Sequence, residues 1–91
     1  TSPLAVIYNN ISNKIYFSTG RQIFEMDLIS NNSLPILIGG NGNIVFFGDG
    51  LNALNASFNS PQGLALDSNN NLLYIADTFN QRIRVINLNN G

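Results

Sequence analysis

The segment YIADTFNQRIRVI, residues 74–86, holds three of the nine charged residues of this chain. Asp77 stands five positions before Arg82 and seven before Arg84. A carboxylate and a guanidinium could serve acid–base chemistry, or they could form a charge-assisted hydrogen bond that fixes two strand ends. Acid–base catalysis most often uses a histidine or further carboxylates, and there is no His and no second acid close to Asp77. The segment therefore favours the structural interpretation.

Composition argues against several other chemistries. The 91 residues include four Lys and Arg and five Asp and Glu, a net charge of −1, so a nucleic-acid partner is not expected. Cys and His are both absent, which removes disulfides and thiolate or imidazole ligands, and no cofactor is expected. The longest apolar runs are far shorter than the roughly 20 residues of a membrane helix, so no membrane insertion is expected.

Two copies of one unit make up most of the chain. Residues 2–18 align without gaps with residues 60–76, and residues 22–28 align with 82–88. Short apolar runs in each copy are separated by Asn, Ser, Gly and Asp, which is the pattern of strands joined by turns. The predicted strands are 4–8, 14–18, 22–28, 34–38, 63–67, 72–76 and 82–87.

A Gly- and Asn-rich segment separates the two copies. Within it, Ala53, Ala56 and Phe58 are expected to form a short helical turn that packs a hydrophobic plug between the units. The predicted parts of the chain are a first unit, a connecting loop and a second unit, at 1–38, 39–60 and 61–91.

The second copy resembles the NHL repeat. The similarity lies in Pro-x-Gly at 61–63, an apolar strand ending in Asp67, a Tyr-x-Ala-Asp run ending in Asp77, and Asn-x-Arg-Ile at 80–83. The first copy is a degenerate match to the same pattern. The connecting loop resembles the Gly-Asp-Gly connection of an NHL subgroup that includes bacterial surface proteins and teneurin-type propellers.

The resemblance implies an all-β fold in which this chain supplies two consecutive blades of an NHL-type β-propeller. Each blade is expected to be a four-stranded antiparallel sheet, the second lacking its outer strand, and propellers of this family usually have six blades. Two blades cannot close a ring, since propellers have four to eight. The remaining blades are expected to come from a longer polypeptide of which this chain is a fragment, or from other copies of the chain.

Comparison of the two copies predicts a structural network. The second copy carries Asp67, Asp77 and Arg82. The first copy carries neutral residues at the equivalent positions, namely Asn9, Thr19 and Gln22. Removing one partner of a buried ion pair costs about 3 to 5 kcal/mol, so joint loss of the charges is what an interacting cluster would show. We expect Arg82 to tie two strand ends together through one or both acids.

Partner binding is expected on the loop-bearing face. Antiparallel order places the 39–60 loop at the same end of the sheets as the turn 78–81, and an exposed aromatic there would suit an anchoring role. The candidate partner-binding residues are Phe46, Phe47, Asp49 and Phe79. Asp49 and nearby Asn residues also loosely resemble a set of calcium ligands, but the spacing fits no EF-hand loop and turn formation explains the same residues.

The expected function is that of a non-enzymatic scaffold or interaction module that binds a protein or glycan. The alternative is part of a propeller enzyme, a metal-dependent lyase or hydrolase whose site lies on blades absent here. Sequons begin at Asn10, Asn31 and Asn55 and would accept N-glycans in a secreted protein. The subgroup resemblance favours an extracellular or cell-surface location, which the sequence itself does not fix.

Overall fold

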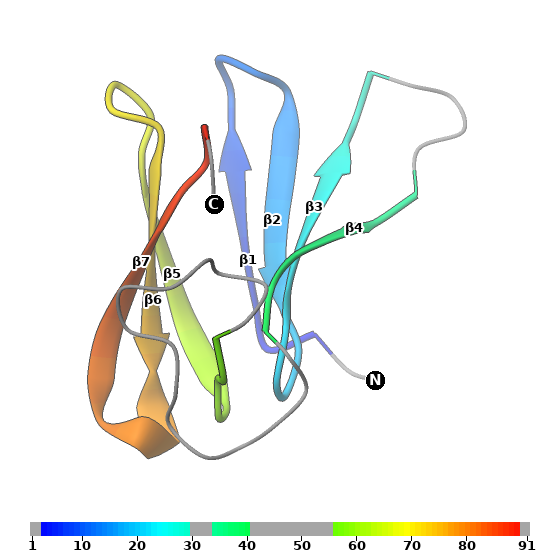
Figure 1. Cartoon of the computed structure of the whole chain (residues 1–91). Coiled ribbons are helices and arrows are strands. Elements are labelled where there is room, and N and C mark those ends of the chain that lie inside the picture. The colour runs from blue at the N-terminus through cyan, green and yellow to red at the C-terminus, as the bar shows by residue number, and fades with distance from the viewer. Residues whose placement is uncertain (1–2, 30–33, 41–55, 90–91) are drawn as a thin grey trace.

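The computed structural model describes residues 3–29, 34–40 and 56–89. These residues form two antiparallel sheets that lie side by side (Figure 1). Sheet 1 contains β1 (Ala5–Asn9), β2 (Lys14–Ser18), β3 (Ile23–Asp27) and β4 (Ile36–Gly39). Sheet 2 contains β5 (Pro61–Asp67), β6 (Leu72–Asp77) and β7 (Arg82–Asn87), with the short 3-10 turn η2 (Thr78–Asn80) before β7.

Each strand pairs with the next strand in the sequence, in the orders β1-β2-β3-β4 and β5-β6-β7. All seven predicted strands are present, and the predicted all-β fold of antiparallel, blade-like sheets is confirmed. Sheet 2 has three strands in the part of the chain that the structure describes, one fewer than sheet 1.

The hairpins β1–β2 and β5–β6 turn in the same way. Asn13 and Asn71 have φ values of 58° and 57°, in the left-handed region that Asn tolerates better than most residues. The amide of Leu28 donates to the carbonyl of Asn13 at 3.0 Å, and the amide of Leu88 donates to that of Asn71 at 2.9 Å. The sequence repeat therefore extends to backbone conformation.

The hydrophobic core lies between the two sheets. Its buried members are Tyr16, Ile23, Ala56, Phe58, Leu73, Ile75 and Ile86. Gly39, at the end of β4, permits a close approach of the sheets. A Cβ atom there would lie 2.9 Å from Ile86 Cδ1 and 3.3 Å from Phe58 Cε2, distances shorter than ordinary van der Waals contact.

The predicted plug is buried, but its described part is not helical. Ala56 and Phe58 are 3% and 1% exposed, whereas Ala53 lies outside the described residues. Ser57 between them forms an isolated β-bridge, and its carbonyl accepts a hydrogen bond from the Arg84 side chain. The amide of Ser60 donates to the carbonyl of Gly20 at 2.8 Å, which ties this connection to the β2–β3 turn of sheet 1.

The two ends of the sheets carry different segments (Figure 1). We call the end with residues 19–22, 56–60 and 78–81 the linker end. The opposite end, with the turns at 10–13 and 68–71, is called the hairpin end. In the described residues no helix has the length and apolar character needed to cross a membrane.

Candidate functional site

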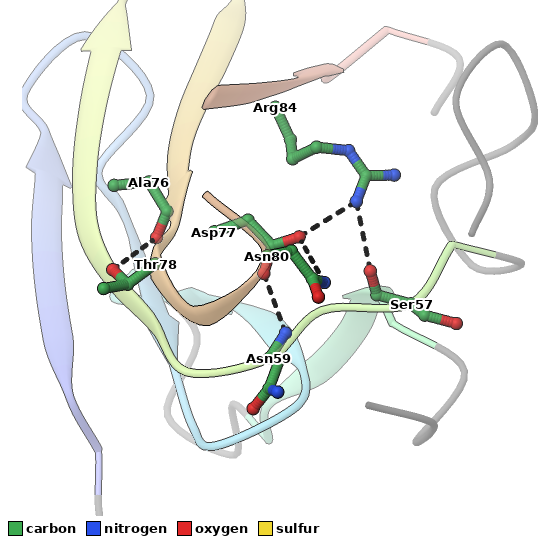
Figure 2. Close-up of polar contacts among 7 residues, drawn as sticks. All are labelled: Ser57, Asn59, Ala76, Asp77, Thr78, Asn80 and Arg84. Atoms are coloured by element: carbon green, nitrogen blue, oxygen red, sulfur yellow. Dashed lines mark hydrogen bonds and ion pairs between the residues drawn. The ribbon is translucent and has the colours of Figure 1, made fainter. Parts of the chain in front are cut away.

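Asp77 is the centre of a buried polar cluster at the linker end, where β6 gives way to η2 (Figure 2). Its side chain is fully buried. One carboxylate oxygen, Oδ1, accepts the amide of Asn59 at 2.7 Å. The other, Oδ2, accepts Nη1 of Arg84 at 3.0 Å and Nδ2 of Asn80 at 2.9 Å. Both oxygens are thus occupied by donors of the chain itself.

Arg84 reaches this carboxylate from β7 and is itself buried. Its Nη1 also donates to the carbonyl of Ser57 at 3.1 Å. The guanidinium carbon lies 5.1 Å from the centroid of the Phe58 ring, within the range of a cation–π interaction. The side chain therefore contacts β6 and the connecting segment together.

The arrangement fastens the connection between the sheets to sheet 2. Asp77 and Arg84 hold Asn59 and Ser57, while the amides of Thr78 and Phe79 donate to the carbonyls of Ser60 and Asn59 at 3.3 and 3.1 Å. We call Asp77, Arg84, Ser57 and Asn59 the staple. The Asp77 carboxylate is buried and both of its oxygens accept hydrogen bonds from the chain itself, so the staple is built for structure.

The prediction that Asp67 belongs to this network is corrected by the strand register. Asp67 pairs with Leu72 at the hairpin end, whereas Asp77 pairs with Pro61 at the opposite end of β5. Asp67 instead accepts Nδ2 and the amide of Asn70, at 2.9 and 3.3 Å. The Asn70 side-chain bond, followed by the backbone bond, lowers the pKa of the Asp67 carboxyl.

Asn9 explains why the first copy needs no acid at this position. Its Oδ1 accepts the amides of Ile11 and Ser12 at 2.9 and 3.3 Å, in the turn equivalent to the one that Asp67 stabilises. A side-chain oxygen acceptor stabilises such turns, and Asn and Asp both provide one.

Arg82 lies directly opposite Asp77 in the β6–β7 register and is exposed. The arginine that forms the buried ion pair is Arg84, whereas the sequence comparison predicted Arg82. The alternation of residues along β7 could have identified Arg84. Ile83 and Val85 lie on one face of the strand, and Arg82 and Arg84 lie on the other. That face is the one that meets the core, so a charge placed there beside Asp77 is a candidate for pairing.

The first copy lacks both charges of the observed Asp77–Arg84 ion pair. Asp77 aligns with Thr19, and Arg84 aligns with Phe24. Thr19 is buried and its amide donates to the carbonyl of Gln22 at 2.9 Å. Phe24 stacks on Phe17 with ring centroids 5.3 Å apart. Sheet 1 thus replaces the ion pair with neutral contacts.

Tyr16 is a buried tyrosine of β2 whose pKa is raised. Burial, followed by the charge of Glu25 and the hydrogen bond to it, raises the pKa of Tyr16 to about 12. Glu25 lies opposite Tyr16 in the β2–β3 register and is 3.5 Å from Nζ of Lys14. The tyrosine therefore stays neutral well above physiological pH.

The remaining candidate residues fall into two groups. Phe79 lies in η2 at the linker end and is 64% exposed, and Asn10 is exposed in the β1–β2 turn. Phe46, Phe47, Asp49, Asn31 and Asn55 lie outside the described residues. Among the described residues no group of three or more His, Cys, Asp or Glu is placed to hold a metal ion.

Two sheets built from one repeated unit, packed face to face through a buried core, define an all-β repeat protein with blade-like units. Residues 58–86 match the family model described as NHL repeat. This segment contains both Asp77 and Arg84, so the matched pattern includes the charged part of the staple.

Two curated proteins are similar to nearly the whole chain. It is 32% identical over 88 residues to NHL repeat-containing protein 2 of Bos taurus, an alignment covering 94% of this chain and 12% of that protein. It is 36% identical over 94 residues to Protein SUPPRESSOR OF QUENCHING 1, chloroplastic, of Arabidopsis thaliana, covering 99% of this chain and 9% of that protein. No solved structure matches.

Residues 58–86 are therefore similar to an NHL repeat, and nearly the whole chain is similar to a segment of each of the two relatives. The chain spans about a tenth of the length of the two relatives, 12% and 9%. The Gly-Asp-Gly subgroup stays a prediction.

Proposed function

We propose that this chain is a non-catalytic interaction module that binds a protein partner through its linker end, with Phe79 as the anchor. NHL repeat domains are generally protein-interaction modules, and the match to that repeat covers residue 79. The observation that carries the proposal is the position of Phe79, a large aromatic side chain that is 64% exposed on a tightly held turn.

The turn around Phe79 is fixed by bonds on both sides. Asn80 donates to the buried carboxylate of Asp77 at 2.9 Å. Gln81 adopts a left-handed conformation and its amide donates to the carbonyl of Thr78 at 3.1 Å. The amide of Phe79 donates to the carbonyl of Asn59 at 3.1 Å. A pre-organised backbone lowers the entropy cost of presenting the ring to a partner.

Exposed aromatic side chains are frequent anchors of protein interfaces, because they bury a large area with few rotatable bonds. In this proposal the staple has a supporting role in binding. Asp77 does no chemistry on a partner, but it holds the turn that presents Phe79.

The test begins with photo-cross-linking from benzoylphenylalanine placed at position 79 or, as a control, at position 11. Ile11 is 70% exposed at the hairpin end, so the two positions match in accessibility. We expect a protein captured from position 79 and not from position 11. That protein is then purified and titrated by calorimetry against wild type, Phe79→Ala and Ile11→Ala.

Phe79→Ala is expected to weaken binding by at least about 30-fold, the loss typical of an interface hot spot of 2 kcal/mol or more. Ile11→Ala should leave the dissociation constant within about twofold of wild type, as a residue outside the interface does. Equal affinities for the two variants would contradict the proposal. Binding on a glycan array that depends on Phe79, with no captured protein, would identify a glycan as the ligand and also contradict it.

A further inference from the structure

The face of sheet 2 that points away from sheet 1 carries exposed apolar side chains. Ile83, Val85 and Tyr74 are 72%, 55% and 39% exposed. An open hollow of about 250 Å³ lies on this face, and its lining includes Gly63, Tyr74 and Ile83. We call this surface the outer face of sheet 2.

The outer face of sheet 2 is equivalent, by the sequence repeat, to the face of sheet 1 that packs against sheet 2. The repeat aligns Tyr74 with Tyr16 and Ile83 with Ile23. Tyr16 and Ile23 are 2% and 0% exposed because they pack against sheet 2. Ala76 likewise aligns with the fully buried Ser18. The same positions are therefore covered in one copy of the unit and open in the other.

Sheet 1 also exposes apolar side chains on its own outer face, which is the face that points away from sheet 2. Val6, Leu4 and Tyr8 are 66%, 43% and 50% exposed there, and the register puts Ile15 and Phe17 on the same face. Four residues of this face have equivalents in the second copy. Val6, Tyr8, Ile15 and Phe17 align with Leu64, Leu66, Leu73 and Ile75, respectively. The latter four form the side of sheet 2 that packs on sheet 1.

Within the residues that the structure describes, the chain thus contains one sheet-to-sheet interface and exposes the two halves of a second. We propose that a second copy of this chain docks the outer face of its sheet 1 onto the outer face of sheet 2, head to tail. Both surfaces are neutral at the residues named above, so the contact buries no unpaired charge. The contact between copies then continues the packing already present within each copy.

Head-to-tail contacts form a closed ring when the rotation between copies allows it. Rings of four to eight blade-like sheets are the usual closed forms, which corresponds to about two to four copies of a two-sheet chain. The staple is not part of this interface, since Phe24 occupies the position of Arg84 on the outer face of sheet 1. Phe79 also lies outside it, so the inference is independent of the proposed partner site.

The experiment measures the mass of the 91-residue chain by light scattering over a dilution series, with circular dichroism to establish folding. The expected mass is a whole multiple of 9.9 kDa that falls toward 9.9 kDa on dilution. Ile83→Asp and Val6→Asp, on the outer faces of sheets 2 and 1, should each give a folded monomer. Ile11→Asp, at the hairpin end, should keep the wild-type mass.

Mixing the two monomeric variants distinguishes head-to-tail docking from other modes. Chains with Ile83→Asp keep an intact outer face on sheet 1, and chains with Val6→Asp keep one on sheet 2. The mixture should form a one-to-one pair and stop there. Ile83→Thr and Val6→Thr, which keep a β-branched shape, serve the same test if the aspartate variants lose their dichroism signal.

Three outcomes would overturn the inference. The first is a wild-type chain that stays a folded monomer at every concentration, as it would if this face takes some other occupant. The second is a wild-type chain that unfolds or forms particles of no fixed mass. The third is self-association of either single variant as strong as that of wild type.

Discussion

Asp77 receives its buried ion-pair hydrogen bond, 3.0 Å long, from Arg84 on the neighbouring strand. The register partner of Asp77 is Arg82, two residues earlier in β7. The two arginines lie on one face of β7 but differ in depth, because Arg84 is 7% exposed and Arg82 is exposed. This difference predicts that they contribute very differently to stability.

Replacing Arg84 with Met should lower the free energy of unfolding by about 3 to 5 kcal/mol, because the Asp77 carboxylate would remain buried without its cation. Arg82→Gln should cost at most about 1 kcal/mol, as is usual for an exposed charge. Urea unfolding followed by circular dichroism, at one fixed protein concentration, measures both variants. Equal losses would show that the depth of the guanidinium is not what matters.

The first copy suggests how the loss can be repaired. Asp77→Thr combined with Arg84→Phe installs the residues that sheet 1 has at the equivalent positions, Thr19 and Phe24. The double variant should unfold at a higher urea concentration than Arg84→Met, since no charge is left buried and unpaired. If it is less stable than Arg84→Met, the neutral pair of sheet 1 does not transfer to this site.

The sequence was sufficient to predict the seven strands, because each apolar run is bounded by turn residues. It was also sufficient to single out Asp77, because the first copy has the neutral Thr19 at the equivalent position. It failed for Asp67, since the motif does not reveal that a side-chain oxygen can stabilise a hairpin turn without any cation. It also failed to choose between Arg82 and Arg84, because burial of an arginine depends on the connecting segment that folds over it.

Phe58 should be one of the most costly core residues to truncate. Its ring is 1% exposed and lies between the two sheets, so Phe58→Ala should cost about 3 to 5 kcal/mol through lost burial and a residual cavity. Phe79→Ala removes an equal side chain that is 64% exposed and should change stability by at most about 0.5 kcal/mol. Thermal or urea unfolding of the pair tests this, and a small effect at position 58 would contradict the packing described.

Gly40 follows β4 with φ of +99°, a conformation that residues with a Cβ rarely adopt. A Cβ there would meet the carbonyl oxygen of Arg21 and lie 3.0 Å from Cα of Gln22, and backbone atoms yield little. Gly40→Ala should therefore destabilise the fold by about 1 to 3 kcal/mol. Gly20→Ala is the matched control, because nothing lies within 4 Å of its Cβ position. Similar urea midpoints for the two variants would argue against this local geometry.

Tyr16 should make the stability depend on pH in the alkaline range. Burial first, and then Glu25, raise its pKa from 10.0 to about 12, so the folded state retains the phenolic proton after the unfolded chain has lost it. The contribution of Tyr16 to the free energy of unfolding is fully present below pH 10. It declines as the pH rises toward 12, by up to about 2 to 3 kcal/mol. Tyr16→Phe should remove this decline, because phenylalanine has no titrating proton. Urea unfolding of wild type and Tyr16→Phe across this pH range, with phenolate absorbance as a direct titration, measures the decline. A decline of the same steepness in Tyr16→Phe would show that another group causes it.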